Sequence, residues 1–150
     1  MTDEYATLRD SNFMRDFLDL VIPPSEDEKM PGAGTLGLSA DLADAIIADA
    51  RFAPLVEAGL QAVQDAAIVR DSAGFSELSP EARLEVVESQ LMAHPALMNG
   101  ITSHLYLAYY QHPAVLEGLG EPARPPFPEG FEVEETDPKL LDALRERARN

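Results

Sequence analysis

Hydrophobic residues recur through most of the chain with the three- and four-residue spacing of a single helix face. This spacing predicts amphipathic helices that each bury one side. Strict alternation of apolar and polar residues, which marks a strand, occurs only in the short stretch from Phe131 to Glu134. We therefore expect an all-α bundle of about five to seven helices. The expected helices run from Ser11 to Ile22, from Ser39 to a break at Phe52 and Pro54, from there to Asp71, from Ser79 to His94, from Ala96 to Gln111, from Pro113 to Leu119, and over residues 137–150.

The same spacing predicts which side chains enter the core. One apolar stripe is visible on each of the longer expected helices. The residues assigned to these stripes are Phe13, Phe17, Leu18 and Val21; Leu42, Ile46 and Ile47; Leu55, Val56, Leu60, Val63 and Ala67; Leu84, Val87 and Leu91; and Leu97, Met98, Ile101, Leu105, Ala108 and Tyr109.

Several helix ends have recognisable capping residues. Ser11 or Asp10 can cap the first helix and Ser39 the second, because a short oxygen-bearing side chain accepts a bond from a free N–H group. Ser79 is followed directly by Pro80, a strong signal for the start of a helix. Gly120 is well placed as the residue just beyond a helix end, where left-handed backbone is common.

Two segments do not follow the helical pattern. Residues 23–38 hold acidic residues, prolines and three glycines, and are expected to form a surface loop. Residues 121–136 hold four prolines, which favour an extended, polyproline-like arm. We expect residues 1–150 to form a single domain, with the extended arm preceding a C-terminal helix over 137–150.

Composition narrows the class of function. The chain has 150 residues, no cysteine and a net charge of −16. Such a surface repels phosphate, so we expect neither nucleic-acid binding nor attachment to an anionic membrane. The N-terminal residues are acidic rather than basic, no twin-arginine pair precedes the apolar run ending at Ile22, and no run is long enough to cross a membrane. A cytoplasmic location is expected, or a periplasmic one only if the chain is exported with a partner.

The residues offer little for catalysis. The three histidines are His94, His104 and His112, and their spacing does not suit a metal site. There is no phosphate-binding glycine motif and no serine in a nucleophile-elbow context. We therefore expect no catalytic, cofactor-binding or metal-binding residue in this chain. One alternative remains, a small-molecule-binding protein or enzyme with a pocket lined by His104 and the tyrosines Tyr106, Tyr109 and Tyr110.

A series of short motifs spans most of the chain. In order they are Phe17…Ile22-Pro23, Gly32-Ala33, Gly74-Phe75-Ser76-Glu77-Leu78-Ser79-Pro80-Glu81, a helix ending in Tyr109-Tyr110, and Pro113…Leu119-Gly120. This order resembles the gluconate 2-dehydrogenase subunit 3 family, the small subunits of FAD-dependent sugar and alcohol dehydrogenases of the glucose–methanol–choline type. The resemblance implies a non-catalytic helical subunit that binds and stabilises a large flavoprotein, or helps to export it. The FAD and the catalytic base would belong to that partner. Many members carry a twin-arginine signal, which is not seen here, and this departure puts an export role in doubt.

The proline-rich arm offers aromatic anchors for a partner. Prolines restrict the unbound chain, so ordering this segment against a surface loses less entropy than ordering an ordinary loop. Two interpretations stay open: the arm packs on the chain's own helices, or part of it meets the flavoprotein. A third possibility for the whole chain is an acidic adaptor unrelated to redox chemistry. The candidate partner-binding residues are Tyr110, Leu116, Pro125, Pro126, Phe127, Pro128 and Phe131.

Overall fold

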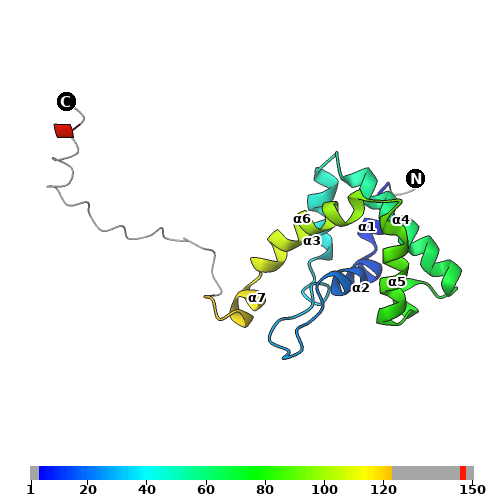
Figure 1. Cartoon of the computed structure of the whole chain (residues 1–150), viewed down its shortest axis with the longest axis horizontal. Helices are drawn as coiled ribbons and strands as arrows, with labels where there is room; N and C mark the ends of the chain where they lie inside the picture. Colours follow the sequence, from blue (N-terminus) through cyan, green and yellow to red (C-terminus); the bar gives the residue numbers. More distant parts are fainter. Residues whose placement is uncertain (1–3, 123–145, 148–150) are drawn as a thin grey trace.

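The computed structural model describes residues 4–122 and 146–147 (Figure 1). All regular secondary structure in these residues is helical. The described part contains no strand, so the prediction of an all-α fold is confirmed. Seven α-helices and one 3₁₀ turn follow one another in these residues: α1 (Ala6–Arg9), α2 (Ser11–Val21), α3 (Ser39–Ala48), α4 (Ala53–Arg70), the turn η1 (Phe75–Glu77), α5 (Pro80–Leu91), α6 (Ala96–Tyr110) and α7 (Pro113–Gly118).

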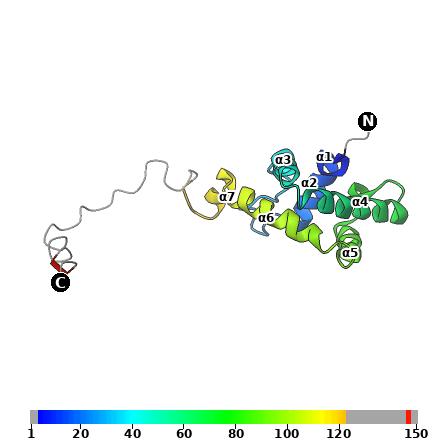
Figure 2. The same cartoon turned by 90° about the horizontal axis from the view of Figure 1, so that it is seen from above.

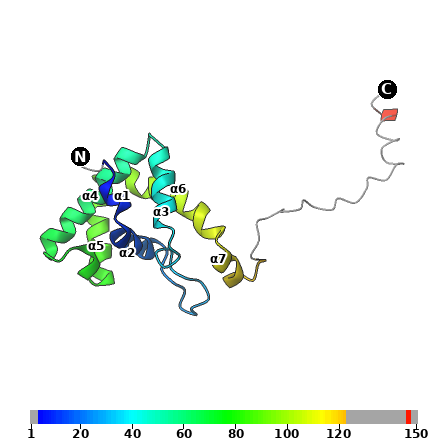
Figure 3. The ribbon, with the colours of Figure 1, turned by 180° about the vertical axis from the view of Figure 1, so that it is seen from behind.

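The long helix α4 is the centre of the bundle. It packs against α6, α5 and α1, while α3 bridges α2 and α6. The first half of α6 lies close to α4, since a methyl group at Gly100 would overlap the side chain of Val56. The second half of α6 runs beyond α4 to α7, which lies at the opposite end of the described body from α5 (Figures 2 and 3). Among the described helices, none covers the outer side of the more C-terminal part of α6, where Tyr106, Leu107 and Tyr110 are at least half exposed.

The caps predicted from the sequence mostly form. Asp10 Oδ1 accepts hydrogen bonds from the backbone N–H groups of Asn12 and Phe13, both at 3.1 Å, and so caps α2. Ser79 Oγ accepts one from the N–H of Ala82 at 3.3 Å and caps α5. Gly120 has φ +79° directly beyond α7. The prediction for Ser39 is wrong: it lies in the first turn of α3, whose start has no side-chain cap.

Two residues assigned to the core lie at the surface instead. Leu55 and Leu84 are 52% and 46% exposed, whereas Val56 on α4 and Val87 on α5 are buried. Helical spacing finds the apolar side of a helix, but the width of the buried stripe depends on where the neighbouring helices cross it. The rest of the core follows the expected stripes closely, with Phe17, Leu18, Leu42, Ile46, Leu60, Val63, Ala67, Leu97, Ile101, Leu105 and Tyr109 all buried.

The helix α1 has no local sequence signal and was not expected. Its first turn is capped by a residue far along the chain: the carboxylate of Glu57 on α4 accepts hydrogen bonds from the N–H groups of Thr7 and Leu8, both at 2.9 Å. An acidic group at a helix N-terminus is favourable because it satisfies free donors and opposes the helix dipole. A four-residue helix is thus held in place by a tertiary contact.

The segment 23–38 is a loop, but the prediction that it lies wholly at the surface is wrong for residues 32–34 and for Leu38, which are buried. Asp19 Oδ1 on α2 accepts hydrogen bonds from the N–H groups of Gly34 at 2.8 Å and Thr35 at 3.2 Å. A methyl group at Gly34 would overlap the carbonyl oxygen of Arg15, so only glycine permits this close approach. The loop is therefore fastened to α2.

The proline-rich arm and the C-terminal helix fall almost entirely outside the described residues. Of the candidate partner-binding residues, this applies to Pro125, Pro126, Phe127, Pro128 and Phe131. None of the described helices combines the length and the apolar character that a membrane-spanning segment needs.

Candidate functional site

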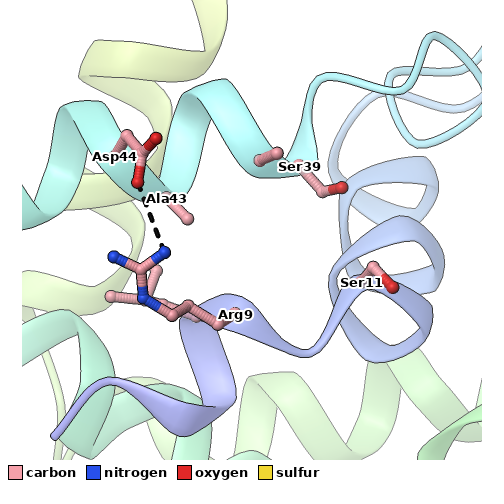
Figure 4. A pocket seen from close by; sticks show the side chains of 7 residues that line it. Arg9, Ser11, Ser39, Ala43 and Asp44 are labelled. Atoms are coloured by element: carbon pink, nitrogen blue, oxygen red, sulfur yellow. Dashed lines mark ion pairs between the residues drawn. The ribbon is translucent and has the colours of Figure 1, made fainter. Parts of the chain in front are cut away.

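A small pocket opens between the N-terminal helices and α3 (Figure 4). Its volume is about 110 Å³. Arg9 Nη1 and Asp44 Oδ1 form an ion pair across it at 3.4 Å, and both side chains are largely solvent-exposed. The remaining lining residues are Leu8, Ser11, Ser39, Ala40 and Ala43.

This pocket is not the one anticipated by the alternative interpretation. Pockets for small organic ligands usually measure about 300–1,000 Å³, several times its volume. Its charged groups already neutralise each other, and neither His104 nor any of the three tyrosines of α6 lines it. The pocket therefore gives no support to a small-molecule site.

The three tyrosines of α6 form one aromatic cluster, in which one ring is buried and two are half exposed. The ring centroids of Tyr109 and Tyr110 lie 5.2 Å apart, and those of Tyr106 and Tyr110 lie 6.2 Å apart. Tyr109 is buried, and its hydroxyl donates a hydrogen bond to the carbonyl oxygen of Pro31 at 2.9 Å. Burial raises the pKa of Tyr109 above its usual range, and the neighbouring Tyr110 raises it further. This tyrosine is a structural tie between α6 and the loop 23–38.

The other two tyrosines belong to an exposed apolar surface. Tyr106 and Tyr110 are each 50% exposed, and Leu107 beside them is 63% exposed. At 100° per residue these three side chains fall within about a third of a turn of α6. We call them the α6 face. Leu119, at the end of α7, is a further large apolar side chain that is 50% exposed, while the predicted contact residue Leu116 is only partly buried.

Lack of charge sets this region of the chain apart. The run from Ser89 to Leu116 contains no Asp, Glu, Lys or Arg, although 25% of the residues of the whole chain are charged. Depletion of charge with enrichment of tyrosine is the compositional mark of the central part of a protein interface. Sequence reasoning selected Tyr110 but missed Leu107, and this uncharged run is the signal that points to both.

The histidines have no common site. His112 Nδ1 accepts a hydrogen bond from the N–H of Ala114 at 3.2 Å and caps α7. Residues 4–122 and 146–147 contain no cluster of three or more potential metal ligands.

Comparison of the chain with protein-family models, curated proteins and solved structures gives no match in any of the three. The argument about function therefore depends on the chain's own residues.

Proposed function

We propose that this chain is a non-catalytic small subunit that binds and stabilises a large FAD-dependent sugar or alcohol dehydrogenase. Two kinds of support meet in this proposal. The order of short motifs along the chain resembles the small subunits of such enzymes. The α6 face supplies the surface that a subunit of this kind needs, and this exposed face is the observation that carries the proposal.

The physical case for binding at the α6 face is energetic. Exposed aromatic and leucine side chains that are freed of water at the centre of an interface supply much of its binding energy, and tyrosine is among the residues that do so most often. Other exposed apolar residues, such as Val69 and Met92, lie in different parts of the structure and do not include a tyrosine. Ile68, next to Val69 on α4, is also 52% exposed, but this pair has no aromatic side chain that could act as an anchor.

The sequence of the proline-rich arm, residues 121–136, makes it a second candidate for contact with the flavoprotein. It follows α7 directly, and Phe127 and Phe131 are its large apolar residues. We expect at least part of the arm to meet the flavoprotein, together with Tyr110 and Leu116.

The test is purification of the endogenous protein. The chain is tagged at its own gene, captured from the cells that express it, and analysed by gel electrophoresis and by absorbance. The proposal predicts a larger protein in fixed stoichiometry and a flavin spectrum in the eluate. The recombinant chain alone should be colourless and without dehydrogenase activity. Capture of the chain with no flavoprotein would contradict the proposed partnership, and a flavin spectrum from the chain alone would contradict its non-catalytic role.

A further inference from the structure

We propose that the α6 face receives a protein surface whose apolar centre is bordered by lysine and arginine on the side of residues 25–29 and α7. This inference rests on the proposed function and specifies the chemistry of the partner's docking surface. It is carried by the distribution of charge around the face.

Carboxylates gather beside one end of the α6 face. Gly118 of α7 lies against the loop 23–38, since a methyl group there would come within 2.5 Å of the carbonyl oxygen of Lys29. Tyr109, in ring contact with Tyr110, is bonded to Pro31 of the same loop. The tip of the loop is therefore next to α7 and the end of α6. Five exposed acidic residues on these segments form what we call the acidic edge: Glu26, Asp27, Glu28, Glu117 and Glu121.

The bases between residues 4 and 122 do not neutralise this edge. Every lysine and arginine between residues 4 and 122 is already in an ion pair with a carboxylate, at distances from 2.7 to 3.5 Å. Within the acidic edge, Lys29 pairs with Asp27 at 3.3 Å. The other four carboxylates of the edge make no ion pair among the described residues. The negative potential beside the face is available to an incoming basic group.

Charge also decides between possible occupants of the face. In a symmetric dimer the same patch meets its own copy, which would bring two acidic edges into one interface. The chain's own segment 121–136 is acidic too, with five glutamates and one arginine, Arg124. The following segment, 137–150, is different, because it holds three leucines and four bases against three acids. Nucleic acid and anionic lipid are repelled. Two occupants therefore combine apolar side chains with bases: a separate protein and the segment 137–150. We choose the separate protein, because the proposed function requires a surface that is open to a partner.

The inference makes separate predictions for the rates of association and dissociation. Opposite charges at the rim of an interface speed up encounter and make it sensitive to salt, whereas desolvated aromatic anchors slow dissociation. We therefore expect association of the full chain with its flavoprotein to slow as sodium chloride is raised. The probe is the flavoprotein captured with the chain, immobilised on a biosensor surface.

Two pairs of double variants separate these effects. The double variant Glu26→Lys/Glu28→Lys should slow association about tenfold at low salt and reduce its dependence on salt. Its control, Glu77→Lys/Glu88→Lys, makes the same change in net charge at exposed positions on η1 and α5, and should have a much smaller effect. The double variant Tyr106→Ala/Tyr110→Ala should speed up dissociation by about 30-fold or more. Its control is Val69→Ala/Met92→Ala, which removes two side chains that are 89% and 93% exposed.

The outcomes distinguish the inference from the proposed function. If the flavoprotein binds and the two charge variants slow its association equally, the acidic edge is not the docking rim and the inference fails while the function stands. Unchanged dissociation of the tyrosine variant, with its thermal melt intact, overturns the α6 face as the contact surface. A self-association that the tyrosine variant abolishes would assign the face to a second copy. Faster association of Phe127→Ala/Phe131→Ala would assign it to the chain's own arm, and faster association of Lys139→Ala/Arg145→Ala would assign it to the segment 137–150. Absence of any flavoprotein from the capture refutes the proposed function itself.

Discussion

Replacing Arg83 by alanine should lower the free energy of unfolding by about 3 kcal/mol, because its guanidinium joins α5 to η1 and α2. Its Nε donates a hydrogen bond to the carbonyl oxygen of Phe75 at 3.1 Å, and its Nη2 donates one to the carbonyl oxygen of Ser76. The same Nη2 lies 3.5 Å from Asp16 Oδ2. The guanidinium also lies over the ring of Phe75, with its carbon 5.6 Å from the ring centroid. One side chain thus holds three elements together.

The magnitude follows from burial. The side chains of Arg83 and Asp16 are only 19% and 10% exposed to solvent. Removal of one partner of a buried ion pair typically lowers the free energy of unfolding by about 3–5 kcal/mol. Burial raises the pKa of Asp16, but hydrogen bonds from Ser76 and Arg15 and the positive charges of Arg83 and Arg15 together outweigh it and leave the pKa below its ordinary value. Asp16 is therefore charged at neutral pH. Arg15 Nε, at 3.0 Å from Asp16 Oδ1, stays in place in the variant, so we expect the lower end of the range.

The assay is urea denaturation at pH 7, followed by the circular dichroism of the helices. The matched control is Arg70→Ala. Arg70 Nη1 lies 2.7 Å from Glu85 Oε2, a shorter separation than in the Arg83 pair, but the two side chains are 45% and 63% exposed. Exposed ion pairs contribute about 0–1 kcal/mol, so the control should change stability by no more than that. Equal losses from the two variants would refute the argument that burial, rather than distance, determines the effect.

Three further predictions concern the core and the loop. Leu105→Ala removes a fully buried side chain and should cost about 2–5 kcal/mol in the same urea assay, whereas a loss below about 0.5 kcal/mol would mean that this side of α6 is not buried. Tyr109→Phe should cost about 1 kcal/mol at pH 7 by removing the hydrogen bond to Pro31. Because the folded state raises the pKa of Tyr109, its contribution is present below the usual tyrosine pKa of about 10 and is lost as the pH rises further. The wild type should thus lose stability in alkaline solution more steeply than Tyr109→Phe, and parallel curves would contradict this. Gly34→Ala should destabilise the chain by at least about 1 kcal/mol, because the added methyl group forces the loop away from α2. Gly37→Ser is the contrast: its side chain meets open space, and only the φ of +71° disfavours it. Equal losses of stability from the two variants would argue against the close approach at Gly34.

Local chemistry explains what the sequence predicts well. Proline and capping residues act within one turn, so Ser79 and Pro80 locate the start of α5 and Gly120 the end of α7 without knowledge of the rest of the fold. Tertiary contacts explain the errors. The helix α1 depends on Glu57, which lies on a different helix, and the exposure of Leu55 and Leu84 depends on where neighbouring helices cross. The buried glycines of the loop belong to a cluster of small residues, and such a cluster predicts a surface loop as readily as a close approach to a helix.

The candidate site was predicted only in part. Tyr110 is exposed on α6 and Leu116 lies nearby along the chain, but the arm residues of the same hypothesis fall outside the described part. Leu107 was missed because helical spacing identifies the buried side of a helix and not its exposed side. Tyr106 was considered only in the alternative hypothesis of a small-molecule pocket. The exposed side of α6 can be recognised only in the assembled bundle, where Tyr106, Leu107 and Tyr110 remain at least half exposed.

Hydroxyl-radical footprinting of the full chain, free and bound to its captured flavoprotein, tests the central claim most directly. Oxidation of a side chain reports its contact with solvent, and mass spectrometry assigns each product to a residue. The account predicts that Tyr106, Leu107 and Tyr110 are oxidised in the free chain and protected in the complex. Met92, which is 93% exposed at the end of α5, should be oxidised equally in both. Protection of Met92 with no change at the two tyrosines would contradict the assignment of the α6 face as the binding surface.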